Sequence, residues 1–471
     1  MKRPNILIIN TDQQRWDALG INNPNYITPN LDNLAKESYM FDMCFVQNPL
    51  CMPSRASVWT GKYPSSLGIL DMAIPLPEDQ INIAHIFNIY GYDTSYFGKM
   101  HFIPHANRDH RELHPSYGFS HLEISDEPGA YEDDYYYWAV SKEKNIRDRI
   151  NPGMPPAAFD WYRLMGKKSI NSPYFPDVPR DDFLKTWISK IPKELSHSSF
   201  VADKTSVKIT SSSSPWLIMA GFFAPHAPMI ASKDFLNLYD ATSIQLPQYT
   251  KEELDRLRNA NISMDTVKEL ILGYRAMVSE VDYNVGKIIK SLKDSGEYEN
   301  TIIVFTSDHG EWLGDCGRFS KGYPADDAVS RVPLLIRIPE SVSDVCKPGR
   351  GIRIKDICEG VDILPTVLEL AGIKRPPHLD GKSICNLING DRHKDFALTE
   401  HRGWKTIRTE EYRYLIKDDG KEFLWDANND VYCRNNLADY PSYKDVLSNM
   451  RLLLLEFLVK RDRGKDPVWP Y

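Results

Sequence analysis

Residues 51–55 are the stretch of the sequence whose residue types most clearly indicate chemistry. Cys51 is followed by Pro53 two positions later and by Arg55 four positions later. The proline blocks regular hydrogen bonding and the arginine places a positive charge nearby, so we interpret the segment as short, polar and turn-prone. Such a setting suits modification of the thiol more than its packing. The alternative is a buried or incidental cysteine in a loop.

Two aspartates, Asp12 and Asp308, each follow an apolar run and are candidate metal ligands. An unpaired carboxylate at the end of a buried strand is costly, and a cation would relieve that cost. Carboxylates and the amide oxygen of Gln13 are hard ligands that suit Ca²⁺ or Mg²⁺, whereas His309 favours Mn²⁺ or Zn²⁺. Each residue alone is more often a cap or a salt-bridge partner, but together at two predicted strand ends they favour a metal site.

Four apolar runs explain how residues far apart in the sequence can meet. Each run has the continuous apolar character of a strand buried on both faces, which is the pattern of a parallel sheet. Open α/β sheets bind ligands beyond the carboxyl ends of their strands, so the polar residues after the runs are expected to share one crevice. The runs are residues 6–9, 96–97, 216–223 and 301–305, and the polar residues that follow them are 11–14, 98–101, 224–228 and 306–310.

Helical periodicity fills the intervals between these runs, which indicates a doubly wound α/β fold. One helix begins at Thr28 and Pro29, in the manner of an N-cap and first helical residue. A longer helix is predicted over residues 266–295, with Gly296 as its terminating residue, and another over residues 362–371.

After residues 376–377 the pattern changes to short strand-like pieces separated by polar turns. Residues 418–420 predict a hairpin, and a helix is predicted over residues 443–461. We therefore expect an α/β domain followed by a smaller α+β domain with an antiparallel sheet. The expected boundaries are 1–375 and 376–471.

Residues 102–179 predict an irregular, aromatic-rich insertion in the first domain. Long irregular insertions are usually functional or mobile. The aromatic rings would either form a wall against a substrate or cover the sheet, and the sequence leaves both open. The residues concerned are Tyr131, Tyr135, Tyr136, Tyr137, Trp138, Trp161 and Tyr162.

Composition excludes several classes of function. A net charge of −7 argues against nucleic-acid binding, which usually requires a basic face. No apolar run approaches about 18 residues, so no membrane-spanning segment is expected. The first apolar run is too short for a signal peptide, which predicts a cytoplasmic protein, or a periplasmic or secreted one if a signal has been removed. The seven cysteines are dispersed and form no C-x-x-C pair, so they make a poor disulfide framework or zinc site.

The motifs of this chain, in order, resemble those of the type I sulfatases, which have the alkaline-phosphatase-like fold. Residues 51–55 match C-x-P-S-R, residues 98–101 match G-K-x-H, and residues 225–228 match P-H-x-P. Asp308 and Lys321 stand at the metal and post-metal positions of that family. The resemblance covers most of the chain. It implies a doubly wound, mostly parallel sheet with helices on both faces.

The resemblance also implies the cofactors. In that family a maturase oxidises the cysteine that corresponds to Cys51 to formylglycine, whose hydrated aldehyde is the nucleophile. One divalent metal is implied, most simply Ca²⁺, with Mn²⁺ or Zn²⁺ as alternatives. Gln13 replaces the usual second aspartate and His309 the commoner asparagine, as in the branch with phosphonate monoester hydrolases, choline sulfatases and uronate 2-sulfatases. The implied ligands are Asp12, Gln13, Asp308, His309 and the modified Cys51.

Three cations and two histidines acquire roles by the same resemblance. Arg55, Lys99 and Lys321 would clamp a sulfate group, because fixed positive charge in a dry site stabilises a transferring sulfuryl group. His226 would protonate the departing alcohol, and His101 is a candidate base near the formylglycine, since histidine titrates near neutral pH. We expect two steps: one hydroxyl of the hydrated aldehyde attacks sulfur, and the other then expels sulfate.

The expected function is therefore hydrolysis of the sulfate ester of a sugar or small organic alcohol, without a nucleic-acid or membrane partner. The aromatic insertion is expected to bind part of the substrate. The net negative charge argues against a broad basic groove and favours an exo-acting enzyme on short substrates. A phosphonate monoester or phosphodiester hydrolase is the nearest alternative. A non-catalytic binding protein is a more distant one, because it would not need an oxidisable nucleophile.

Overall fold

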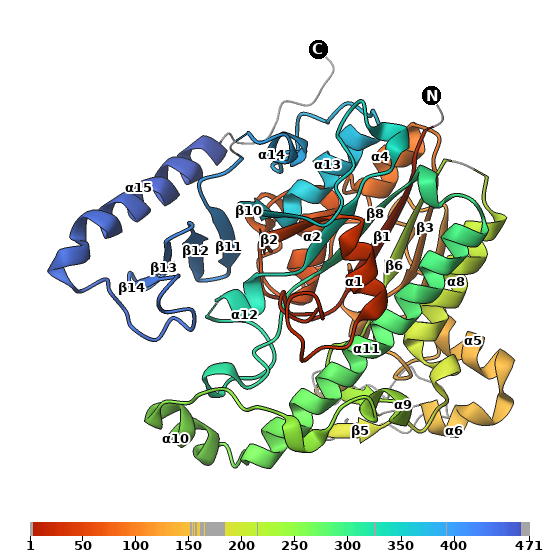
Figure 1. The fold of residues 1–471 in the computed structure, drawn as a ribbon, viewed down its shortest axis with the longest axis horizontal. Helices are drawn as coiled ribbons and strands as arrows, with labels where there is room; N and C mark the ends of the chain where they lie inside the picture. Colours follow the sequence, from red (N-terminus) through yellow and green to blue (C-terminus); the bar gives the residue numbers. More distant parts are fainter. Residues whose placement is uncertain are drawn as a thin grey trace.

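The computed structural model describes residues 3–150, 153, 155, 158–160, 164, 184–213, 215–324, 326–391 and 393–462. At its centre is an eight-stranded sheet with the strand order β10-β2-β9-β8-β1-β6-β3-β4 (Figure 1). Among the described residues, none of the helices combines the length and the apolar character that crossing a membrane requires.

The middle of this central sheet is formed by three parallel strands. Ile6 of β1 pairs with Leu217 of β6 on one side and with Ile302 of β8 on the other. β9 runs antiparallel to both of its neighbours, so the sheet is mostly parallel, as predicted. The strands are β1 (Asn5–Thr11), β2 (Tyr39–Phe45), β3 (Asp93–Gly98), β4 (His121–Ile124), β6 (Trp216–Gly221), β8 (Thr301–Ser307), β9 (Leu334–Arg337) and β10 (Ile352–Glu359).

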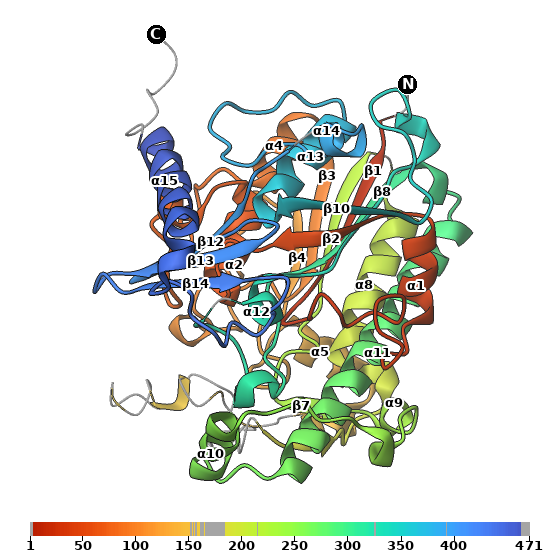
Figure 2. The same ribbon diagram turned by 60° about the vertical axis from the view of Figure 1, so that its left-hand side comes forward.

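Helices cover both faces of the central sheet. Leu7 and Ile9 pack into a core with α1, α8 and α11, whereas Ile6 and Ile8 pack into a second core with α2, α4 and α13. Figure 2 shows α1, α8 and α11 on one side of the strands and α4 and α13 on the other. The larger helices are α1 (Pro29–Lys36), α2 (Cys51–Thr60), α4 (Ile83–Ile89), α5 (Asp134–Lys142), α8 (His197–Ser211), α10 (Lys251–Asn259), α11 (Met264–Asp294), α13 (Ile363–Leu370) and α15 (Lys444–Arg461).

The remaining strands and helices are short. β5 (Thr186–Ile188) and β7 (Met229–Ala231) form a separate parallel pair. The short helices are α3 (Pro64–Leu67), α6 (Arg147–Ile150), α9 (Lys233–Leu236), α12 (Asp327–Ser330) and α14 (Cys385–Ile388).

The boundaries of the long predicted helix follow from local capping. The Ser263 side chain accepts a hydrogen bond from the backbone N–H of Thr266, which begins α11. Gly296 has φ +75°, a conformation that glycine adopts without the penalty of a Cβ atom, and it terminates the helix as predicted.

The C-terminal sheet consists of β11 (Ala397–His401), β12 (Trp404–Arg408), β13 (Tyr412–Lys417) and β14 (Glu422–Asp426), all antiparallel. α15 packs on it through Leu447, Met450 and Leu454. The predicted hairpin connects β13 to β14, where Gly420 has φ +80°. Figure 2 shows this sheet and α15 beside the central sheet, at the side opposite α1 and α11. The predicted antiparallel sheet is therefore confirmed.

The aromatic insertion differs from the prediction. Instead of irregular chain, its described part contains β4, α5 and α6. Tyr135 and Trp138 of α5 pack against Phe200 of α8. These two rings therefore pack inside the protein, as in the packing alternative, while Tyr137 is 51% exposed. Trp161 and Tyr162 lie outside the described residues. The buried rings are Tyr131, Tyr135, Tyr136 and Trp138.

Candidate active site

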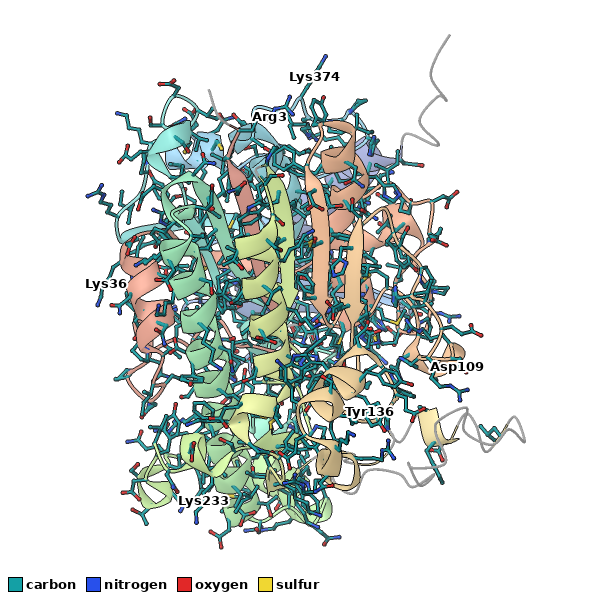
Figure 3. The ribbon with its side chains drawn as sticks, turned by 90° about the vertical axis from the view of Figure 1, so that its right-hand side faces the viewer. Arg3, Lys36, Asp109, Tyr136, Lys233 and Lys374 are labelled. Atoms are coloured by element: carbon teal, nitrogen blue, oxygen red, sulfur yellow. The ribbon has the colours of Figure 1, made fainter. Side chains whose placement is uncertain are left out.

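The predicted crevice lies at the edge of the central sheet where β1, β3, β6 and β8 end. In the backbone register, Thr11 pairs with Ser307, and Gly98 pairs with Gly221. Figure 3 shows the strands running from the end near Arg3 toward the end where Tyr136 and Lys233 lie. Because the pairing is parallel, the polar residues that follow these four strands become neighbours in space.

Arg55 bridges the two aspartates from within the protein. Its Nε donates to Asp308 Oδ2 at 2.7 Å, and one terminal nitrogen donates to Asp12 Oδ2 at 3.1 Å. The other donates to the Lys99 carbonyl at 2.7 Å. The side chain is fully buried and all three nitrogens are occupied. Arg55 therefore orients the two carboxylates, and its part in a sulfate clamp stays a prediction.

Cys51 is the first residue of α2, so its segment is the opening turn of a helix and not the irregular turn that we predicted. Pro53 is the third residue of the helix, where a backbone N–H would have no intrahelical acceptor, so the proline is tolerated. The Ser54 hydroxyl donates to the carbonyl of Asp308 at 2.5 Å, which ties the start of α2 to the end of β8. The motif thus fixes the sulfur at the strand ends.

The sulfur of Cys51 contacts both the candidate metal ligands and Lys321. It is 3.1 Å from His309 Nε2 and 3.7 Å from Asp12 Oδ1. On its other side, Lys321 Nζ donates to it at 2.5 Å. Cys51 is completely buried.

The residues predicted as metal ligands come together. Four candidate ligand atoms lie within 4.8 Å of one another, one each from Asp12, Cys51, Asp308 and His309. The amide oxygen of Gln13 is buried without a hydrogen-bond partner, while its Nε2 donates to Glu311. His309 Nδ1 donates to the Gly310 carbonyl at 2.9 Å, so the Nε2 lone pair faces the cluster. A buried oxygen without a donor is costly, and a cation would satisfy it, so the residues fit a divalent metal.

The protonation states of these residues also suit a cation. Burial alone would raise the pKa of Asp12, but the charges of Lys99 and Arg55 contribute to holding it well below its usual value. Burial lowers the pKa of His309, which keeps the imidazole neutral. Burial, with Asp12 nearby, raises the pKa of Cys51 to about 11. Because the thiolate is the nucleophilic form, an unmodified Cys51 would be a weak nucleophile at neutral pH.

Lys99 and Lys321 present positive charge beside the sulfur. Lys99 Nζ lies 2.8 Å from Asp12 Oδ2 and 4.6 Å from the centre of the Phe223 ring, and it is fully buried. Lys321 is partly buried and contacts both Cys51 and, at 3.0 Å, His226 Nε2. The structure thus brings both predicted lysines to the site.

The two predicted histidines are also present, in different settings. His226 Nδ1 donates to the Ala227 carbonyl at 2.5 Å, so its Nε2 accepts from Lys321. Both ring nitrogens of His101 are buried without a hydrogen-bond partner. Burial lowers the pKa of both histidines well below its usual value, and Lys321 and Lys99 respectively add to the effect. Both rings are therefore neutral at pH 7.

Three supporting residues were missed by the sequence analysis. Glu311 accepts from Gln13 Nε2, and the Tyr274 hydroxyl donates to the Gln13 carbonyl at 2.8 Å. Asp126 Oδ1 accepts the backbone N–H groups of Met100 and His101 at 2.9 and 2.8 Å. Only Glu311 carries a sequence signal, since it lies in the same post-strand segment as Asp308.

A cavity of about 650 Å³ adjoins the site. Phe223 forms part of its wall, and the same ring lies 4.9 Å from the His226 ring between centroids. The remaining wall combines apolar groups with hydroxyls, one carboxyl group and the basic side chains of Arg149, Lys190 and Lys193. Its lining includes Tyr135, Trp187, Ser198, Ile230, Met277 and Glu280.

Comparison with known proteins gives consistent matches along the chain. The family model described as Sulfatase matches residues 4–373, and the one described as N-sulphoglucosamine sulphohydrolase, C-terminal, matches residues 314–460. The chain is 27% identical to an arylsulfatase of Clostridium perfringens, over 98% of this chain and 96% of that protein. It is 26% identical to an N-acetylglucosamine-6-O-sulfatase of Bacteroides thetaiotaomicron, over 99% and 88%.

Solved structures show the same architecture. A phosphonate monoester hydrolase of Agrobacterium radiobacter superimposes with a TM-score of 0.78 at 22% identity, over 97% of this chain and 96% of that one. BT4656 in complex with its substrate D-glucosamine-2-N,6-O-disulfate superimposes with a TM-score of 0.73 at 22% identity, over 99% and 100%. These matches confirm the predicted fold class.

Proposed function

Because the chain belongs to the sulfatase family and is a hydrolase acting on sulfate esters, we propose that it cleaves the sulfate ester of a sugar or small organic alcohol. We propose further that a maturase converts Cys51 to formylglycine and that one divalent metal, most simply Ca²⁺, binds beside it. The observation that carries the proposal is the position of the Cys51 sulfur, between the candidate metal ligands and Lys321. In this structure that sulfur stands for the oxygens of the modified residue.

The proposed metal ligands already have the support that a cation requires. When bound, the metal would polarise the oxygens it contacts and lower the pKa of a bound hydroxyl. Arg55 orients the two aspartates, and the Gly310 carbonyl orients His309. The proposed ligands are Asp12, Gln13, Asp308, His309 and the modified Cys51.

The modified Cys51 would supply the nucleophile, because hydrated formylglycine is a geminal diol with one hydroxyl available for attack on sulfur. Lys99 and Lys321 bind the sulfate oxygens in this proposal. Lys321 Nζ contacts the sulfur and Lys99 Nζ contacts Asp12, and Lys99 is shielded from water. Fixed charges in such a site stabilise the charge that develops on a transferring sulfuryl group.

We assign proton delivery to the pair formed by Lys321 and His226. The Nε2 atom of His226 accepts from the Lys321 ammonium, so the proton available to a departing alkoxide lies between these two groups. This refines the expectation that His226 alone is the acid. His101 is the proposed base for sulfate release, because both of its nitrogens are buried without a partner.

The organic group of the substrate is assigned to the cavity beside Phe223. Phe223 in the cavity wall contacts the His226 ring, near which the departing oxygen would lie, and the cavity size is within the range of about 300–1,000 Å³ typical of small-molecule sites. Its aromatic and aliphatic wall suits the face of a ring, and its serine hydroxyls suit ring substituents. Tyr135 of α5 lines this cavity, so the assignment retains one ring of the aromatic insertion that we expected to bind the substrate.

Phosphonate monoester hydrolysis is the second candidate. Gln13 and His309 occupy the positions at which this chain departs from the commoner sulfatase pattern, and the neutral Gln13 leaves the metal site less negative than a site with one more carboxylate. Matched aryl sulfate and aryl phosphonate esters distinguish the two reactions through the ratio of their kcat/KM values.

The decisive experiment on the proposal concerns Cys51. Co-expression with a maturase should convert Cys51 to an aldehyde, visible by peptide mass spectrometry, and the converted fraction should track the specific activity. Cys51→Ser should react at most once and retain a sulfuryl group, since a serine ester lacks the second hydroxyl that would expel sulfate. Several turnovers by Cys51→Ser, or full activity of a protein with an unmodified thiol, would contradict the proposal. Cys433→Ser, which changes a cysteine outside the cluster, is the matched control.

A further inference from the structure

Lys321 reaches the site on a stretch of chain that lies between the central sheet and the C-terminal sheet. We call residues 318–324 and 326–327 the Lys321 segment. It follows the turn after β8 and ends in the first residue of α12. No strand of either sheet includes it, so contacts of its side chains and backbone must hold its lysine against Cys51.

The far end of the segment is held by two arginines of the C-terminal sheet. Asp327 accepts a hydrogen bond from Arg413 and lies 3.6 Å from Arg408 Nε. Arg408 and Arg413 are directly opposite each other in the pairing of β12 with β13. Like charges in this position repel, and the two residues are only 6% and 3% exposed. The Asp327 carboxylate supplies the compensating charge, and although burial opposes ionisation, the arginines hold its pKa below the usual value.

A second contact with the same sheet lies closer to the lysine. The Tyr323 ring is 6.0 Å from the Trp404 ring between centroids, and the Lys417 ammonium lies 5.0 Å from the Tyr323 ring centre. Trp404 is in β12 and Lys417 ends β13. Tyr323 is 39% exposed, so the contact is made at the surface.

The near end of the segment is held by the candidate metal site. Glu311 accepts from the backbone N–H of Ser320 through one carboxylate oxygen and from Gln13 through the other. The Ser320 carbonyl accepts from the backbone N–H of Trp312 at 3.0 Å. Lys321 therefore directly follows Ser320, which is held at the candidate metal site. It lies two residues before Tyr323, which contacts the C-terminal sheet.

We propose that the C-terminal sheet positions Lys321 for catalysis, with Asp327 as the principal positioning residue and Tyr323 as the second. Asp327 does not touch the reacting atoms; it fixes the segment by satisfying the opposed arginines. The inference rests on the proposed function, since it assigns a cause to the placement of a residue in that site. Its consequence is that a change in the C-terminal sheet alters sulfate-ester turnover through Lys321.

The test is a double-mutant cycle on the matured full-length enzyme, with 4-nitrophenyl sulfate as the probe. Asp327→Asn should lower kcat/KM by about 10–100-fold, because a displacement of about 1 Å at a catalytic group has effects of that size. In a Lys321→Ala background the same change should have less than about a twofold effect, because the positioned group is gone. Asp327→Glu, which keeps the charge, should recover part of the activity. Glu299→Gln, which removes a partner of Arg337 away from the site, is the control and should leave kcat/KM unchanged.

The outcomes separate this inference from the proposed function. If wild-type enzyme with converted Cys51 shows no sulfate-ester turnover, the proposed function fails. If wild type is active but folded Asp327→Asn matches it, or if the effect is fully additive with Lys321→Ala, the positioning role is overturned. Should Asp327→Asn not fold, Tyr323→Ala takes its place in the cycle, since its partly exposed ring can be removed with less effect on folding. Unchanged kcat/KM in folded Tyr323→Ala would then overturn the inference.

Discussion

The two halves of the active site are built in different ways. Asp12, Asp308 and His309 directly follow strands of the central sheet and are at most 1% exposed. Asp308 Oδ1 accepts the backbone N–H groups of Gln13 and His309 at 3.0 and 2.9 Å, so the strand register itself sets their positions. Lys321 and His226, in contrast, lie on loops, are partly exposed and hold each other through side chains.

This difference separates two requirements of the reaction. In the proposed function, the strand-borne half would bind the metal beside Cys51, and the geometry required there is the same for every ester of sulfuric acid. The loop-borne half faces the leaving alcohol, which differs from substrate to substrate. Rigid elements suit the first task, and loops held by replaceable side-chain contacts suit the second. Substitutions in the two halves should therefore have different kinetic effects.

The largest effect is expected in the strand-borne half. Asp308→Ala should bind no divalent metal and show no detectable turnover on any ester, because it removes one ligand and releases Arg55 from its partner. Calorimetric titration with Ca²⁺, Mn²⁺ and Zn²⁺ measures the binding, and chelation of wild-type enzyme should reproduce the loss of activity. Asp240→Asn, at an exposed cap, is the control. Metal binding at wild-type affinity by Asp308→Ala would contradict the assignment.

The next effect is expected in the loop-borne half and should depend on the leaving group. His226→Ala should lower kcat about 10²–10⁴-fold for an alkyl sulfate, whose alkoxide requires a proton, and far less for 4-nitrophenyl sulfate. The measurement is the slope of log kcat against the pKa of the leaving alcohol. His121→Ala, at an exposed position of β4, should leave that slope unchanged. Equal losses on both esters would show that His226 acts on the sulfate group and not on the leaving oxygen.

The same difference explains what could be predicted from the sequence. The strand-borne residues were identifiable because each follows an apolar run, and parallel strands necessarily bring such positions together. The contacts of Arg55 were not identifiable, because its acceptors are residues that follow β1, β3 and β8. Only the fold brings these residues to one guanidinium. The burial of the aromatic residues of α5 was not predictable for the same reason: the sequence shows how many there are, whereas packing against α8 is a property of the tertiary structure.

A smaller, substrate-dependent effect is expected in the cavity. Met277→Trp, in α11, would occupy part of the cavity without touching the groups assigned to sulfate. We expect kcat/KM for a bulky ring ester to fall about tenfold or more relative to that for a methyl or ethyl sulfate, since a filled pocket excludes the larger group. Tyr283→Trp, at an exposed position of the same helix, is the matched control. Equal effects on small and large esters would place the organic group outside this cavity.

The smallest effect is expected on folding stability, and it concerns Asp133 at the start of α5. Asp133 caps α5 by accepting from the Tyr136 N–H at 3.1 Å, and burial raises the pKa of its carboxyl group to about 8. The unfolded chain releases this proton near pH 4, whereas the folded protein retains it to about pH 8, so folding stability falls as pH rises between these values.

Asp133→Asn should remove that dependence, because asparagine caps a helix about as well as aspartate and does not ionise. The melting temperature of the variant should therefore exceed that of wild type by an amount that grows from about pH 5 to about pH 8. Asp240→Asn is the control, since Asp240 caps a surface turn and its hydrogen bonds lower its pKa, which leaves no titration in this range. Melting curves of Asp133→Asn and wild type that stay parallel across these pH values would show that Asp133 is ionised in the folded protein. Activity should be unchanged at each pH, because Asp133 is neither in the lining of the cavity nor in the candidate metal cluster.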